Sequence, residues 1–342
     1  MLTDYALMLL LLLFMGIAAL YRINIHPQGN GDFFGAENTK AMRGMWCIVI
    51  VLVHTPVAYQ NMLQDAIGSF AFIGVTFFFM TSAYGLALSA AKNGGCVQGF
   101  WRRRLPKVLI PQVIANVLMT TIFIAVGMKR LELGMLLYCN SWLKWLLVFY
   151  LIYWIACLVG RTDVSRNRVA CGLVLTFSLV TYVLKTIGII TSTVWSVEML
   201  GCIWGIVLAS YRSRLLQASS TRWGMKCLAG CAVALLLGVA YLRFKPVVFW
   251  GDYLLRIALG VAIIGFILLL NTKVSVGNRV LQFLGAISYG IYLIHGRVFD
   301  LVEHLAPWLS SGAFILCGLM ISVVLATCIW RLSEWLNKKL HW

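Results

Sequence analysis

Charged residues are scarce in this 342-residue sequence, and their scarcity excludes a soluble protein. Only 11% of the residues are Asp, Glu, Lys or Arg, whereas 61% are apolar. A soluble domain does not bury this much apolar surface, so the composition indicates a polytopic membrane protein. The net charge of +17 does not indicate a nucleic-acid partner. The cations stand in short clusters between apolar runs, which is the pattern of the positive-inside rule.

Several signatures of catalysis and of ligand binding are also missing. The chain has no GxSxG, DxxD or HExxH pattern and no Gly-rich phosphate loop before a strand. Its ten cysteines include no CxxC pair and no Cys/His ligand spacing. We therefore expect no metal site, and we interpret the cysteines as small core or lipid-facing residues rather than as disulfides.

Eleven apolar runs are long enough, or nearly long enough, to span a bilayer. They cover residues 5–21, 42–59, 67–91, 108–127, 142–159, 169–187, 194–210, 225–242, 253–270, 280–302 and 312–335. The first run lacks the basic start and the cleavage site of a signal peptide, so we predict a retained helix. With the N-terminus outside and the C-terminus in the cytoplasm, 20 of the 28 Lys and Arg residues lie on the cytoplasmic side.

These runs divide the chain into four parts. We predict an N-terminal transmembrane helix in 1–22, a cytoplasmic loop in 23–41, a membrane domain in 42–336 and a cytoplasmic tail in 337–342. No loop is long enough to form a separate soluble domain. The fold class predicted from this pattern is an all-α polytopic membrane protein with about eleven spans.

The run from Arg43 to His54, followed by Thr55 and Pro56, is the most informative stretch. Eleven residues close to within ~20° of three full helical turns, so both side chains point the same way, ~16 Å apart. In a helix over 42–59, Arg43 lies at the rim and His54 near mid-membrane. Ionisable groups at that depth usually face a polar cavity, so we expect a hydrated passage between the two. Pro56 frees a carbonyl beside the histidine.

Four cations stand within six residues at Arg102, Arg103, Arg104 and Lys107. Clustered guanidinium groups suit phosphate through bidentate hydrogen bonds. One interpretation is a docking site for a phosphorylated cytosolic donor such as coenzyme A. The other is an orientation signal that contacts anionic lipid.

Two acidic residues lie within apolar segments. Glu198 is able to pair with a helix cation, to raise the basicity of a histidine or to bind an acceptor hydroxyl. Asp252 and Arg256 stand at i and i+4, a spacing that predicts a local ion pair.

A late stretch places Ser288, Tyr292 and His295 at i, i+4 and i+7, on one face of a helix. This polar face suits a cavity, and it also suits packing and hydrogen bonding to another helix. In the stretch 77–85, Thr81 and Ser82 add hydroxyls, and we expect Gly85 to allow close helix approach.

These motifs together resemble the acyltransferase-3 family of integral-membrane O-acyltransferases, over roughly residues 36–335. Arg43-x10-His54 is similar to the family's first-helix signature, and residues 288–295 (SYGIYLIH) resemble its late SYxIYLxH helix. The basic run 102–111 and the stretch 77–85 are also similar, although Ala83 stands where glycine is usual. The resemblance implies a ten-helix core, with the first apolar run as an additional helix.

The resemblance also implies an activity, which is transfer of an acyl group, usually acetyl from acetyl-CoA, to a hydroxyl of a carbohydrate acceptor. In much of the family the acceptor is a surface glycan precursor beyond the bacterial cytoplasmic membrane. Arg43 and His54 are then the catalytic residues, with His54 as general base or as an acyl-carrying nucleophile. Residues 102–104 and Lys107 bind the donor, while Glu198, Ser288, Tyr292 and His295 support the acceptor side.

Two other functions remain open from the residues alone. A transporter or flippase of a lipid-linked glycan would use His54 and Glu198 as a proton relay and would need no acyl donor. A glycan polymerase would carry large, charged outer loops, whereas the outer loops predicted here are short. The expected partners are the bilayer, acyl-CoA and a hydroxyl acceptor, with no nucleic acid. No permanently bound cofactor is expected, and the sequence does not indicate an oligomeric state.

Overall fold

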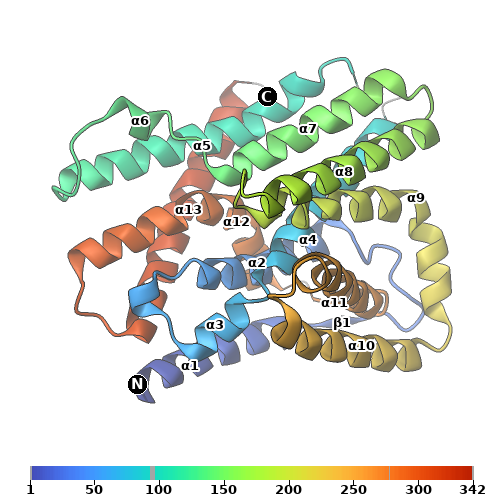
Figure 1. Ribbon diagram of the computed structural model, residues 1–342, viewed down its shortest axis with the longest axis horizontal. Helices are drawn as coiled ribbons and strands as arrows, with labels where there is room; N and C mark the ends of the chain where they lie inside the picture. The colour runs from blue at the N-terminus through green and yellow to red at the C-terminus, as the bar shows by residue number, and fades with distance from the viewer. Residues whose placement is uncertain (1, 93–96, 277, 341–342) are drawn as a thin grey trace.

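Long helices account for nearly all of the protein (Figure 1). The computed structural model describes residues 2–92, 97–276 and 278–340. Within them the α-helices are α1 (Leu2–Leu20), α2 (Ala36–Val53), α3 (Met62–Gly68), α4 (Ala71–Lys92), α5 (Phe100–Ala125), α6 (Leu133–Leu136), α7 (Ser141–Val159), α8 (Asp163–Thr186), α9 (Gly201–Ser220), α10 (Trp223–Phe244), α11 (Arg256–Asn271), α12 (Arg279–Leu305) and α13 (Ser311–Lys339). Each predicted span corresponds to one of the long helices.

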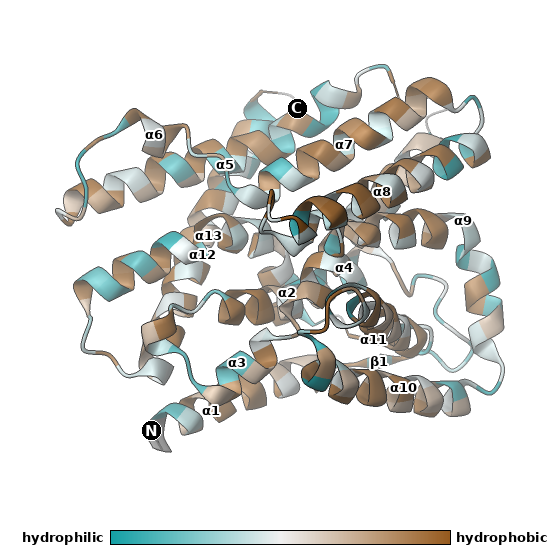
Figure 2. Ribbon diagram, in the orientation of Figure 1, coloured by the Kyte–Doolittle hydropathy of each residue, from teal (hydrophilic) through white to brown (hydrophobic). Residues whose placement is uncertain are grey.

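Eight helical segments in the described part of the chain are long and apolar enough to cross a bilayer. The apolar part of α1, Asp4–Leu20, is shorter. α2 carries Glu37, Lys40 and Arg43, and α12 carries the polar stripe that includes His295. The helices are hydrophobic along much of their length (Figure 2). On α10, Leu228 and Leu236 are more than 70% exposed, as lipid-facing residues are. The protein is an all-α polytopic membrane protein.

Short elements join the long helices. Turns of 3₁₀-helix cover η1 (Val57–Tyr59), η2 (Thr193–Trp195) and η3 (Glu198–Leu200), and a π-helical turn, η4 (Trp250–Leu255), precedes α11. The strands β1 (Asn24–Ile25) and β2 (Val274–Ser275) pair antiparallel. This pairing ties the segment between α1 and α2 to the connection between α11 and α12.

Glycines set the closest helix contacts. α2 packs along α12, and α4 packs along α9. A Cβ on Gly285 would collide with the carbonyl of Lys40, and one on Gly44 would collide with the carbonyl of Leu281. Gly201 and Gly205 meet the backbone of α4 in the same way. Small residues let helix backbones approach in a membrane, where apolar burial drives association less than it does in water.

Gly85 does not have the role expected from the sequence. It is exposed, and a Cβ at this position would meet nothing within 4 Å. The close packing of α4 uses the backbone of Thr76 and Met80 instead, because the glycines at that contact belong to α9. Gly85 therefore borders open space.

Three sequence predictions differ from the structure in detail. α2 begins at Ala36, inside the predicted loop 23–41, and its first turn includes Thr39, whose hydroxyl donates to the carbonyls of Gly35 and Ala36. α13 continues through Lys339, into the predicted tail, of which residues 341–342 lie outside the described residues. Cys157 is disulfide-bonded, contrary to expectation, because sequence spacing does not reveal which thiols meet in space. Eight other cysteines are free.

Replacing Gly285 with alanine should force α2 and α12 apart. Because the obstructing atom is a backbone carbonyl, we expect Gly285→Ala to lower the free energy of unfolding by about 1–3 kcal/mol. The measurement is the unfolding temperature of the purified protein in detergent. Gly172→Ala in α8 is the matched control, since a Cβ there meets nothing within 4 Å. Equal unfolding temperatures for the two variants would contradict the packing argument.

Candidate active site

The histidine that follows α2 and a histidine of α12 lie beside each other. The ring centroids of His54 and His295 lie 4.7 Å apart with an interplanar angle of 67°. His54 is exposed, whereas His295 is 6% exposed. A water-sized molecule therefore reaches His54, and His295 is enclosed behind it.

The hydrogen bonds of the two rings define which nitrogen is available for chemistry. Nδ1 of His54 lies 2.8 Å from the carbonyl oxygen of Ile50, and Nδ1 of His295 lies 3.1 Å from that of Ile291. A carbonyl oxygen only accepts, so each Nδ1 carries a proton and donates it. In a neutral ring this arrangement leaves Nε2 with a free lone pair, as a general base requires.

His54 stands at the end of α2 rather than within a helix over 42–59, which corrects the sequence prediction. α2 ends at Val53, and His54 is its C-cap. Pro56 has no N–H for the carbonyl of Leu52, as expected. That carbonyl accepts instead from the Thr55 hydroxyl at 2.9 Å and from the Gln64 amide at 2.5 Å. Gln64 is 1% exposed and fixes the turn that carries His54.

Arg43 lies on the face of α2 that carries His54, but no hydrated passage runs along that face. Cys47, Ile50 and Val51 occupy the intervening turns, and each is at most 2% exposed. Arg43 itself stands seven residues into the helix, ~10 Å from its first residue. The guanidinium is half-buried, and its Nε has no hydrogen-bond partner among the described residues. Any route from Arg43 to His54 must follow another helix.

The predicted polar face of α12 lies behind the histidine pair. Tyr292 stands 5.6 Å from His295 and 5.2 Å from Trp142 of α7, measured between ring centroids. Trp142 in turn lies 4.7 Å from Phe79 of α4. Ser288 is buried and donates its hydroxyl to the carbonyl of Gly285 at 2.8 Å. The aromatic rings therefore connect the histidine pair to α7 and α4, and Ser288 serves its own helix.

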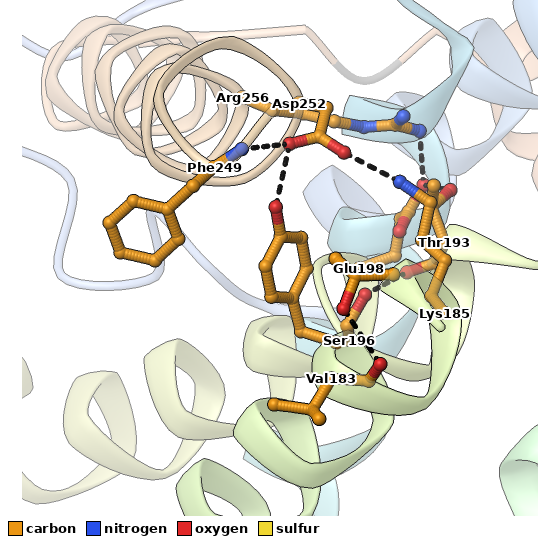
Figure 3. Close-up of polar contacts among 10 residues, drawn as sticks. Val183, Lys185, Thr193, Ser196, Glu198, Phe249, Asp252 and Arg256 are labelled. Atoms are coloured by element: carbon orange, nitrogen blue, oxygen red, sulfur yellow. Dashed lines mark hydrogen bonds and ion pairs between the residues drawn. The ribbon is translucent and has the colours of Figure 1, made fainter. Parts of the chain in front are cut away.

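Two ion pairs join α8, η3 and the η4–α11 segment (Figure 3). Glu198 accepts from Arg256 at 2.5 Å, and Asp252 accepts from Lys185 at 2.6 Å. The predicted local pair between Asp252 and Arg256 is therefore wrong. The π-helical turn shifts the i, i+4 register between these two residues, and each finds a partner on another segment. Glu198 is 1% exposed, and one of its oxygens lacks a partner in the described structure.

The basic cluster lies in the first turns of α5 and not in a loop. The helix begins at Phe100, eight residues earlier than predicted, and continues through Pro106 and Pro111. Arg103 donates to the carbonyl of Gln98 at 2.8 Å, and Arg104 stacks 4.3 Å from the Phe100 ring. Arg102, Arg103 and Lys107 are exposed. Cations at a helix N-terminus are unfavourable beside the helix dipole, so an anion bound there would be stabilised.

A second polar group on α5 was not recognised in the sequence. Gln112 and Asn116 are buried and hydrogen-bonded to each other, and both donate to the carbonyl of Tyr138. Arg297 of α12 donates to Asn116 at 3.2 Å. Two amides at i and i+4 in an apolar helix were the available signal. The group anchors the connection between α5 and α7 to α12.

Removing one residue of the ion pair between Glu198 and Arg256 should destabilise the protein, whereas replacing both with apolar residues should not. Glu198→Ala leaves the half-buried Arg256 without its partner, and we expect the free energy of unfolding to fall by about 3 kcal/mol. The double variant Glu198→Leu with Arg256→Met should recover most of the unfolding temperature and should retain transfer activity. A double variant that is stable but inactive would assign Glu198 to the chemistry instead.

The comparisons with known proteins agree with these motifs. A family model described as an acyltransferase domain, of the acyltransferase-3 type, matches residues 38–331. No curated protein and no solved structure matches the chain. The matched segment includes α2, α4, α5 and α12, and hence both histidines and the basic cluster. The chain belongs to this family and is a membrane acyltransferase.

Proposed function

We propose that the protein is an O-acetyltransferase. It moves acetyl from cytosolic acetyl-CoA to a hydroxyl of a cell-surface polysaccharide or of its lipid-linked precursor. The observation that carries this proposal is the state of His54, which is reachable by solvent, has its Nδ1 held by a carbonyl and keeps Nε2 free. A hydroxyl is a poor nucleophile until a base removes its proton, and Nε2 is placed to do so.

The transfer step uses His54 as general base. Nε2 accepts the acceptor's hydroxyl proton while that oxygen attacks the thioester carbonyl. The carbon–sulfur bond then breaks, and the proton passes from the imidazolium to the thiolate of coenzyme A. The proton on Nδ1 stays on that nitrogen throughout, hydrogen-bonded to the carbonyl oxygen of Ile50. This hydrogen bond keeps the ring in one orientation.

His295 supports His54 rather than contacting the acceptor. It is buried and stands edge to face with the His54 ring, so it limits the rotamers available to that ring. Tyr292 closes the far side of His295. Glu198 belongs to an ion pair with Arg256 and holds η3 against α11. His295 and Tyr292 position the base, and Ser288 stabilises α12.

The basic end of the bundle supports a cytosolic, anionic donor. We define the basic end as the starts of α5 and α8 together with the end of α9, which lie at the right in Figure 1. From the positive-inside count we infer that this end faces the cytoplasm and that the N-terminus is outside, in the cytoplasmic membrane of a bacterial cell. Arg102 and Arg103 are exposed there and attract the phosphates of coenzyme A. Arg43 is half-buried between this end and His54. Because packed turns separate it from His54, it adds positive charge that attracts the donor and does not contact the reacting atoms.

Replacing His54 with alanine should abolish transfer without unfolding the protein. Because positioned general-base catalysis contributes about 10²–10⁴ in rate, we expect His54→Ala to lower the acetylation rate by that factor. The measurement is transfer of labelled acetyl from acetyl-CoA to the surface polysaccharide. His304→Ala is the control, since His304 is exposed at the end of α12. Wild-type acetylation by His54→Ala would refute the assignment.

The acceptor is tested separately by mass spectrometry of the surface polysaccharide from cells with and without this gene. We expect an acetyl-sized mass difference on the glycan. Unchanged polysaccharide would exclude this acceptor class and would leave the acyltransferase itself intact.

A further inference from the structure

A polar cavity of about 500 Å³ lies between α4, α8 and α9, at the basic end. Asp163, Asn167 and Arg168 of α8 line one wall, and Ser210 and Tyr211 of α9 line another. It is the most polar of the cavities described for this chain, since those beside α1 are bordered almost wholly by apolar side chains.

A bend in α9 opens this cavity. Tyr211 has non-helical backbone angles, φ −122° and ψ 17°, and α9 turns sharply after it (Figure 1). The arm beyond the bend is held away by Arg212, which donates to the carbonyl of Gly31 and to Asp32. The Tyr211 ring is thereby left 48% exposed at the cavity wall.

The charges around the cavity favour an anion. Arg168 is exposed and makes no hydrogen bond or ion pair within the described structure. Arg214 stacks 5.6 Å from the Tyr211 ring. The one acidic residue of the lining, Asp163, is already paired with Arg166 at 2.8 Å. The side-chain amide oxygen of Asn167, Oδ1, is buried without a hydrogen-bond partner in the described structure. It is therefore available to accept from an amino or hydroxyl group of a ligand.

An accessible stripe of α4 leads from this cavity toward the histidine pair. Leu88 lines the cavity and is 40% exposed, Gly85 borders open space, and Thr81 is half-buried. These residues lie on one face of the helix, at steps of three and four residues. One turn further, Phe78 lies 5.9 Å from Trp142, which contacts Tyr292 beside His295. From Leu88 to Thr81 the accessible stripe is ~10 Å long, and the buried Phe78 closes its far end.

We propose that this cavity binds the nucleotide end of the coenzyme-A donor, and that the donor's pantetheine arm lies along the α4 stripe. Arg168 binds the 3′-phosphate, Tyr211 stacks on the adenine, and the Asn167 oxygen accepts from its amino group. The absence of a side chain at Gly85 leaves room for the arm. Residues 102–104 attract the negatively charged donor, and the cavity then binds its nucleotide end. This assignment rests on the proposed function for the identity of the donor.

The first test compares coenzyme A with 3′-dephospho-coenzyme A on the purified full-length protein by titration calorimetry. We expect the wild type to bind coenzyme A more tightly than 3′-dephospho-coenzyme A. Arg168→Ala should weaken the binding of coenzyme A about tenfold and should abolish the preference between the two ligands. Arg161→Ala is the matched control, because Arg161 is exposed on the α7–α8 connection just before α8 and does not line the cavity. If Arg168→Ala keeps the wild-type preference, the 3′-phosphate does not bind there and the proposal fails.

The second test uses Gly85→Leu, which should block the arm and leave the nucleotide seat intact. We expect 3′,5′-ADP to bind Gly85→Leu as it binds the wild type, and coenzyme A to bind at least tenfold more weakly. Gly172→Leu in α8 is the control, since its position also borders open space. Wild-type affinity of Gly85→Leu for coenzyme A would overturn the placement of the arm.

The two proposals fail in distinguishable ways. If the protein acetylates its acceptor and Arg168→Ala does not change donor affinity, the nucleotide seat is wrong and the proposed function stands. If Arg168-dependent binding of 3′,5′-ADP is measured and no acetyl transfer occurs, the seat stands and the proposed function is wrong.

Discussion

The close approach of α2 and α12 is the constraint on which the histidine pair depends. Gly44 and Gly285 let the two backbones touch, with no side chain between them and the opposite carbonyls. At that separation the short imidazole side chains of His54 and His295 reach one another, each ten residues after the glycine of its own segment. Helices held at an ordinary interaxial distance of 8–10 Å would not bring their rings into contact so directly.

Charge in this bundle is divided between two regions with different partners. Away from the basic end, Lys185 and Arg256 are matched by Asp252 and Glu198 across different helices, so those cations are neutralised inside the protein. At the basic end Arg168 and Arg102 have no acidic partner in the described structure. The first arrangement stabilises the fold, and the second leaves positive charge available to a mobile anion.

The sequence predicted the helices well, because long apolar runs determine them. It also placed His295 within its helix. The sequence did not predict the end of α2, since Gln64, twelve residues after Leu52, satisfies the Leu52 carbonyl that Pro56 leaves free. Nor did it predict the ion pairs, because the π-helical turn changes the register of Asp252 and Arg256. These features depend on contacts between segments that are distant in the sequence. The local sequence pattern does not reveal such contacts.

The additional helix α1 is integrated into the domain at both of its ends. Asp4 accepts from the backbone N–H of Gly312 at the start of α13, and Asn278 donates to the carbonyls of Ala18 and Tyr21 where α1 ends. Without α1, the Gly312 N–H and the Asn278 side-chain amide would lose these hydrogen-bond acceptors. The helix α1 therefore serves as a structural brace across the surface of the domain.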